Sequence, residues 1–283
     1  MTRVAVLGLG AMGRAIAARL LGAGHDLAVW NRTPRRDDEL VASGARRASS
    51  PDEAVSDREA VITMVTDGPA LEQVLFGDGG AVSAIPHDAT LIEMSTIGPT
   101  ALASVAQRLA PVAVLDAPVL GSVPSVETGR LVIFVGGDRE VFERHADLLG
   151  LLGTTMYLGA SGSGAMLKLV NNAAGIAALV AVGELLALTD RAGLDLDVVL
   201  DSIAAGPLAS MVERWRPRLK EEDQSSYFRL ALARKDLALA FDEAERLGTR
   251  LSVPEAAAAR CDETIEAGLG DEDFGAVVGF LRR

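Results

Sequence analysis

The stretch VAVLGLGAMG, residues 4–13, joins a short apolar run to three glycines with the spacing GxGxxG. Residues 3–7 have the composition of a buried β-strand, and an alanine-rich helical pattern follows the glycines to about Gly24. A glycine loop between a strand and a helix is typical of dinucleotide binding, because the helix N-terminus offers free N–H groups to a pyrophosphate. The residues expected to bind the cofactor here are Gly8, Leu9, Gly10, Ala11, Met12 and Gly13.

Each glycine has its own expected task. Gly8 permits the tight turn, Gly10 lets the backbone approach the pyrophosphate, and Gly13 lets the helix pack close to the strand. Glycines that only make a turn are the alternative interpretation.

Strand-like and helical patterns alternate after this loop. Apolar runs at 25–31, 60–65 and 90–94 alternate with helical stretches near 69–76 and 100–110. This alternation predicts βαβ units and a mostly parallel sheet. Three later runs, within 112–119, 129–137 and 154–159, are expected to extend the same sheet through short connections.

The pattern becomes helical after Gly159. Residues 163–191 read as one helix about 40 Å long, at 1.5 Å per residue. Further helices are expected at 195–205, 207–220, 227–247 and 254–268. The predicted fold is therefore an α/β Rossmann domain (1–160) that binds a dinucleotide, followed by an all-α C-terminal domain (161–283). The long interdomain helix joins them.

The end of the second predicted strand indicates which dinucleotide binds. An NAD site usually places Asp or Glu there to accept from the ribose 2′-OH, but this sequence has Asn31, Arg32 and Thr33. A guanidinium can hold a 2′-phosphate through two hydrogen bonds, and Asn31 and Thr33 add neutral donors. NADP(H) is the expected cofactor, with a solvated basic loop as the alternative.

Two loops at later strand ends should also reach the cofactor. They contain Val65, Thr66 and Asp67 after one strand and Thr96 after the next. Ligands of open α/β sheets bind outside the carboxyl ends of the strands, which favours these positions. Ordinary helix capping by Thr66, Asp67 and Thr96 explains the same residues equally well.

Composition limits the possible partners. The net charge of −12 argues against a nucleic-acid surface, and the single cysteine, Cys261, excludes an intrachain disulfide and favours a reducing compartment. No signal-peptide pattern is present, and Glu184 interrupts the most apolar stretch, so we expect a cytoplasmic protein outside the membrane. The three histidines have no metal-ligand spacing and are expected on the surface or in loops, without a metal site.

The stretch GSGAMLKLVNN, residues 162–172, contains one of only three lysines among 27 basic residues. Carbonyl reduction needs a proton donor for the developing alkoxide, and lysine can serve, whereas arginine does not release its proton at neutral pH. Lys168 and Asn172 are four residues apart and share a helical face, and Gly162 and Gly164 would let the nicotinamide come close. A lysine that extends along an apolar helix to solvent is the alternative.

The motifs GLGAMG, NRT, MSTIGP, DAPVLGS, GSGAMLKLVNN and KDLALA occur in an order that resembles the β-hydroxyacid dehydrogenase family over residues 3 to about 240. That family includes 3-hydroxyisobutyrate dehydrogenases and NADPH-dependent glyoxylate and succinic semialdehyde reductases. The resemblance implies that Lys168 is catalytic, Asn172 supports it, and Lys235 lies near nicotinamide and substrate. It also implies that the loop 119–123, with Gly121, Ser122 and Val123, binds a substrate carboxylate.

This loop departs from the family pattern, because Leu120 replaces a serine and Ser122 replaces a glycine. The resemblance implies an NADP(H)-dependent oxidoreductase that interconverts a small 3-hydroxyacid-type alcohol and its aldehyde or ketone, assembled as a dimer or tetramer. The helical domain (161–283) is expected to serve substrate binding and dimerisation, and we expect a homodimer because this domain is too small and apolar to close a site alone.

Three other interpretations stay open. An NADPH-dependent imine reductase shares this fold, although the position of Lys168 is usually not lysine there. A module that binds the cofactor without catalysis is a second alternative, but such a module would not need Lys168, Asn172 and Lys235 to occur together. Nucleic-acid recognition through the arginines of 32–36 conflicts with the overall acidity. Lys235 and Asp236 could also form a surface ion pair.

Overall fold

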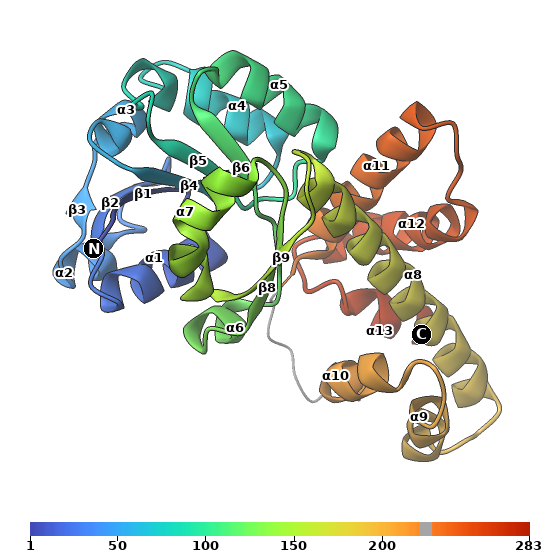
Figure 1. The fold of residues 1–283 in the computed structure, drawn as a ribbon. Helices are drawn as coiled ribbons and strands as arrows, with labels where there is room; N and C mark the ends of the chain where they lie inside the picture. The colour runs from blue at the N-terminus through green and yellow to red at the C-terminus, as the bar shows by residue number, and fades with distance from the viewer. Residues whose placement is uncertain (221–227) are drawn as a thin grey trace. The chain divides into compact units, whose positions relative to one another are not determined.

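The computed structural model describes residues 1–220 and 228–283, which form two compact units, Met1–Leu169 and Val170–Arg283. The first unit contains all named strands and the second is helical (Figure 1). The division between the units lies inside a long helix that begins at Ser163. The predicted boundary near 160 lies just before that helix.

A parallel sheet of six strands forms the centre of the first unit, in the order β3-β2-β1-β4-β5-β6. Its strands are β1 Arg3–Leu7, β2 Asp26–Trp30, β3 Arg46–Arg47, β4 Ala60–Thr63, β5 Thr90–Glu93 and β6 Ala113–Asp116. Strand β1 pairs with β2 on one side and β4 on the other, with Val6 opposite both Val29 and Ile62. The carboxyl ends of β1, β2, β4 and β5 therefore meet at one edge, where this class of sheet binds ligands.

Helices cover both faces of this sheet (Figure 1). One face packs against α1 (Ala11–Gly22) and α7 (Arg139–Gly150), and the other against α3 (Pro51–Val55), α4 (Gly68–Phe76) and α5 (Pro99–Leu109). Short elements complete this part: α2 Asp38–Ala42, η1 Ala81–Ser83 and α6 Val123–Glu127. Because both faces are covered, the central strands are apolar throughout rather than alternating.

The prediction that the apolar runs within 112–119, 129–137 and 154–159 extend the main sheet is wrong for the second and third runs. Only β6 joins it, whereas β7 (Val119–Leu120), β8 (Leu131–Val135) and β9 (Gly153–Tyr157) form a separate sheet. Pro118 splits the run 112–119, since proline has no N–H to donate to a ladder. The expected short connection between β8 and β9 is instead helix α7, capped by Asp138, whose carboxylate accepts from the N–H groups of Glu140 and Val141.

Helix α8 (Ser163–Arg191) has the bounds that the sequence predicts. The helices after it are α9 Leu196–Ala204, α10 Ala209–Leu219, α11 Leu230–Arg246, α12 Ser252–Thr264, the π-helical turn η2 Ile265–Leu269 and α13 Ala276–Arg282. Residue 227, where one predicted helix begins, lies outside the described residues, and α13 was not predicted. The predicted fold class, a Rossmann domain followed by a helical region, is confirmed.

Helix α8 is also long and apolar enough to cross a membrane by length and composition, and 44% of its most apolar window is buried. Core helices of soluble proteins share this length and composition.

His145 corrects an expectation from the sequence. It lies in α7 with 4% of its surface exposed, not on the surface or in a loop. Burial, followed by the nearby Arg144 charge, lowers the pKa of its imidazole. His145 is therefore a neutral core residue at pH 7.

Candidate functional site

The glycine loop has the geometry that its spacing predicts. Gly8 has a φ of 97°, and a side chain there would overlap the carbonyl oxygen of Met64. A Cβ on Gly13 would overlap the carbonyl oxygen of Gly8, so this glycine permits close contact between helix and turn. A Cβ on Gly10 would meet nothing within 4 Å, and no side chain caps α1. The free space and uncapped helix end fit a pyrophosphate.

Asn31 holds this loop in place, a role that the sequence did not suggest. Its Oδ1 accepts from the N–H of Leu9 at 2.8 Å, and its Nδ2 donates to the carbonyl oxygen of Thr33 at 2.9 Å. The Leu9 side chain is fully buried. The hydrogen bond between Asn31 and Leu9 therefore connects the end of β2 to the glycine loop.

Arg32 is exposed directly after β2, as is Thr33. The first carboxylates after them, Asp37 and Asp38, both pair with Arg47. Asp37 is also buried. Asp37 and Asp38 are therefore engaged in ion pairs with Arg47. Arg32 is the first charged residue after β2.

The loops after β4 and β5 are joined by a buried polar network. The N–H of Val65 donates to Ser95 Oγ at 2.8 Å, and the N–H of Ser95 donates to Glu93 Oε1 at 2.6 Å. The hydroxyl of Thr63 donates to the other carboxylate oxygen of Glu93, which is 1% exposed. Sequence reasoning missed Glu93 and Ser95, since a strand of four residues gives no sign of which polar ends are buried.

Asp67 caps a helix, which was the alternative interpretation for this position. Its Oδ1 accepts from the N–H of Ala70 at 2.8 Å at the start of α4. The hydroxyl of Thr66 lies 3.2 Å from Asp67 Oδ2 and donates to it. Thr66 is exposed and Thr96 is partly exposed at this edge.

The predicted substrate loop is a turn between β7 and α6. Gly121 has a φ of 137°, and a Cβ there would lie 2.7 Å from Leu131 and 2.9 Å from Ser125. Ser122 forms a capping box with Ser125 at the start of α6, and Val123 is the first residue of that helix. The serine that replaces a family glycine therefore has a structural task, which is to begin α6.

Lys168 lies in the second turn of α8 and is partly buried. The expectation that Gly164 admits the nicotinamide is wrong. A Cβ on Gly164 would overlap the carbonyl oxygen of Phe134 and lie 2.9 Å from Asp116, so the protein itself fills this space. Gly162 has a φ of 90°, which lets the chain turn into α8.

Asn172, Lys235 and Asp236 form a cluster in the helical unit. Asn172 Nδ2 donates to Asp236 Oδ2 at 2.6 Å. Lys235 Nζ lies 2.9 Å from Asp236 Oδ1 and forms an ion pair with it, although the two groups are not aligned for a hydrogen bond. Asp236 is only 2% exposed, so this pair is not a surface ion pair. The cluster fixes the amide of Asn172, with its nitrogen toward Asp236.

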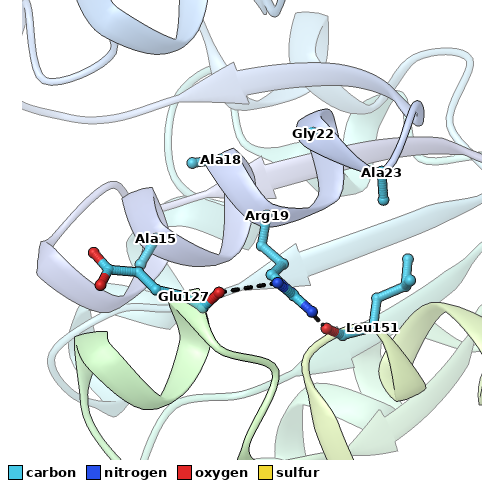
Figure 2. A pocket seen from close by; sticks show the side chains of 7 residues that line it. All are labelled: Ala15, Ala18, Arg19, Gly22, Ala23, Glu127 and Leu151. Carbon is cyan, nitrogen blue, oxygen red and sulfur yellow. Dashed lines mark hydrogen bonds between the residues drawn. The ribbon is translucent and has the colours of Figure 1, made fainter.

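A surface hollow of about 560 Å³ lies beside the second half of α1, lined by Ala15, Ala18, Arg19, Gly22, Ala23, Glu127 and Leu151 (Figure 2). Arg19 donates there to the carbonyl oxygens of Leu151 at 2.7 Å and Glu127 at 2.9 Å. None of the lining residues belongs to the predicted site. Arg19 instead ties α1 to the ends of α6 and α7.

Comparison with known families agrees with this geometry. Residues 3–160 match the family described as the NAD-binding domain of 6-phosphogluconate dehydrogenase. Residues 162–281 match the family described as "NAD-binding of NADP-dependent 3-hydroxyisobutyrate dehydrogenase".

Individual relatives include reductases of small aldehydes. Glyoxylate/succinic semialdehyde reductase 1 of Arabidopsis thaliana is 32% identical, covering 97% of this chain and 96% of the relative. The 3-sulfolactaldehyde reductase of Escherichia coli is also 32% identical, covering 100% and 96%.

Solved structures with this fold include 3-hydroxyisobutyrate dehydrogenase of Mycobacterium tuberculosis with L-serine, at a TM-score of 0.90 and 28% identity over the whole of both chains. An imine reductase of Streptomyces aurantiacus is less similar, at 0.66 and 26%, covering 99% of this chain and 100% of that one. The matched families, the relatives and the glycine loop agree, and the chain belongs to the β-hydroxyacid dehydrogenase family of nicotinamide-dependent oxidoreductases, which includes the 3-hydroxyisobutyrate dehydrogenases.

Proposed function

We propose that this protein is an NADP(H)-dependent reductase of a small aldehyde or ketone, which it interconverts with a 3-hydroxyacid-type alcohol. Lys168 is the proton donor in this proposal. The observation that carries it is the position of Lys168 one turn before Asn172 on α8, with the Asn172 amide held by buried Asp236.

NADP(H) is favoured over NAD(H) by the residues after β2. Arg32 is exposed at that position, and the following carboxylates are engaged with Arg47. The glycine loop from Gly8 to Gly13 would hold the pyrophosphate, and Val65, Thr66, Asp67 and Thr96 would border the cofactor from neighbouring strand ends. Bound NADPH would supply the hydride.

The protein's own contribution is the proton. As the carbonyl carbon gains hydride, the oxygen gains negative charge, which the Lys168 ammonium stabilises before it donates a proton there. Neutral Lys168 then recovers its proton from solvent.

Asn172 assists as an acceptor. Its nitrogen donates to Asp236, so Oδ1 is the end that serves the reaction, accepting from the Lys168 ammonium or the substrate hydroxyl.

The proposed substrates are small aldehydes that carry an anionic group. The relatives named for glyoxylate, succinic semialdehyde and 3-sulfolactaldehyde reduction support this class, because each substrate has a carboxylate or sulfonate. The backbone of Gly121, Ser122 and Val123 is the proposed binding site for that anion. Leu120 adds bulk within this loop and favours a substrate with an apolar part.

Imine reduction is the second candidate, supported by the altered loop 119–123 and by the imine reductase fold. The higher TM-score to a hydroxyacid dehydrogenase and the presence of Lys168 favour carbonyl reduction. An NADPH oxidation screen over semialdehydes, larger aldehydes, ketones and cyclic imines separates the two. Binding of NADPH without turnover on any of them would indicate a cofactor-binding module. We further propose a cytoplasmic homodimer.

Lys168 provides the direct test. We predict that Lys168→Ala lowers kcat by at least about a hundredfold, the scale of general acid–base groups. Lys168→Arg should be similarly impaired, because it keeps the charge but does not release the proton. Lys220→Ala is the matched control, since that lysine pairs with Asp197 and belongs to no proposed site. Near-normal turnover of folded Lys168→Ala would reject the mechanism.

A further inference from the structure

We infer that Asp116 is a positioning residue for Lys168, because its buried carboxylate fixes the first turn of α8 to the end of β6. This inference rests on the proposed role of Lys168. It concerns a residue that lies in the sheet, 52 positions before the lysine that it would position.

Both carboxylate oxygens of Asp116 bind the start of α8. Oδ1 accepts from the N–H of Gly162 at 2.9 Å, and Oδ2 accepts from the N–H of Ala165 at 2.9 Å. The Asp116 side chain is 1% exposed, so water does not compete for these bonds. A buried carboxylate that bridges two backbone N–H groups holds them more strongly than a neutral acceptor does.

Two glycines make room for this carboxylate. A Cβ on Gly136 would lie 2.7 Å from both oxygens of Asp116, and a Cβ on Gly164 would lie 2.9 Å from Oδ2. The backbone of Asp116 also pairs with Gly136, through N···O distances of 3.1 and 2.9 Å. The surrounding backbone therefore leaves just enough room for the carboxylate.

The helix needs an external cap at this position. Gly162, the residue before α8, has a φ of 90° and no side chain that could accept from the first turn. Helices usually obtain that acceptor from a Ser, Thr, Asp or Asn at the N-cap. Here β6 supplies it, and the helix cannot shift along its axis without breaking both bonds.

Lys168 follows Ala165 by three residues, so it lies one turn beyond the fixed N–H group. Asp116 also begins the connection to the proposed substrate loop 119–123. One carboxylate therefore sets the position of the proposed proton donor relative to that loop. Reaction rates are sensitive to such placement, since an error of about 1 Å can cost about a hundredfold.

The test is Asp116→Asn, which nearly preserves volume but turns an amide N–H₂ toward one of the two backbone donors. We expect kcat to fall at least about tenfold by misplacement of Lys168, while the Kd for NADPH changes little. The control is Asp138→Ala, which removes the carboxylate that caps α7 through two backbone N–H groups in the same unit. The control should lower Tm without changing kcat.

A double-mutant cycle separates positioning from general stability. If Asp116 acts through Lys168, Asp116→Asn in the Lys168→Ala background should lower kcat less than about threefold further, because coupled residues are non-additive. Equal loss in both backgrounds, or unchanged kcat in the single variant, would overturn the inference. Should Asp116→Asn not fold, Gly136→Ala displaces the same carboxylate and undergoes the same cycle. Normal turnover of Lys168→Ala would instead reject the proposed function itself.

Discussion

Arg32 is the residue on which the proposed preference for NADPH over NADH rests. We predict that Arg32→Ala raises the KM for NADPH at least about tenfold, the loss expected for one charge-assisted hydrogen bond. The KM for NADH should change little, because NADH has no 2′-phosphate to pair with the guanidinium. Steady-state kinetics with both cofactors measure this, with Arg139→Ala as an exposed control that pairs with Glu143. Equal effects on the two cofactors would contradict the assignment.

At the residue scale, the sequence indicates the candidate cations but not which carboxylates are buried. Lys168 was noticeable because lysine is rare in this chain. Glu93, Asp116 and Asp236 are each at most 2% exposed, yet an acidic residue at a strand end or after a lysine looks the same when it is solvated. Burial of a carboxylate depends on donors that fold against it from distant segments, as Gly162 and Ala165 do for Asp116.

In the strand–turn–helix element from β1 to α1, two glycine variants allow effects on protein stability to be separated from effects on cofactor binding. We predict that Gly10→Ala keeps Tm within about 2 °C, because its Cβ enters free space and its φ is −63°. That Cβ should still weaken NADPH binding, since it would occupy the proposed position of the pyrophosphate. Gly13→Ala should instead destabilise the protein by about 1–3 kcal/mol through overpacking against Gly8.

Thermal melting and cofactor titration of both variants test this pair of expectations. Loss of stability in Gly10→Ala, or unimpaired NADPH binding by it, would show that the loop does not receive the pyrophosphate as proposed.

At the scale of helices and strands, the sequence predicts an element correctly where an apolar pattern spans the whole element. Helix α8 and strands β1, β4 and β5 follow from their apolar patterns. Strand β3 is two arginines, so it has no apolar pattern to find. The second sheet was missed because a run of apolar residues does not say which strand it pairs with, and β8 pairs with β7 and β9 instead of β6.

At the scale of the whole molecule, an exposed apolar surface on α8 needs an explanation. In α8, the exposed positions Val170, Ala174, Ala181, Leu185 and Leu188 recur at helical spacing and form one stripe. Leu185 is 51% exposed and Leu188 is 63% exposed, and Leu194 and Val198 follow at 56% and 66%. Contiguous apolar surface of this kind usually marks an interface. Glu184, which pairs with Arg260 beside the stripe, favours a protein partner over a lipid surface.

We therefore predict a homodimer that buries this stripe, with light scattering giving about twice the 29.5 kDa of one chain at micromolar concentration. Leu188→Glu should shift the mass toward the monomer, because it places a charge in the apolar contact. Val82→Glu is the control, since Val82 is also an exposed apolar residue, at 42%, but lies in η1 of the other unit. A monomeric wild-type protein, or a dimer that Leu188→Glu leaves intact, would show that the stripe is not the contact between copies.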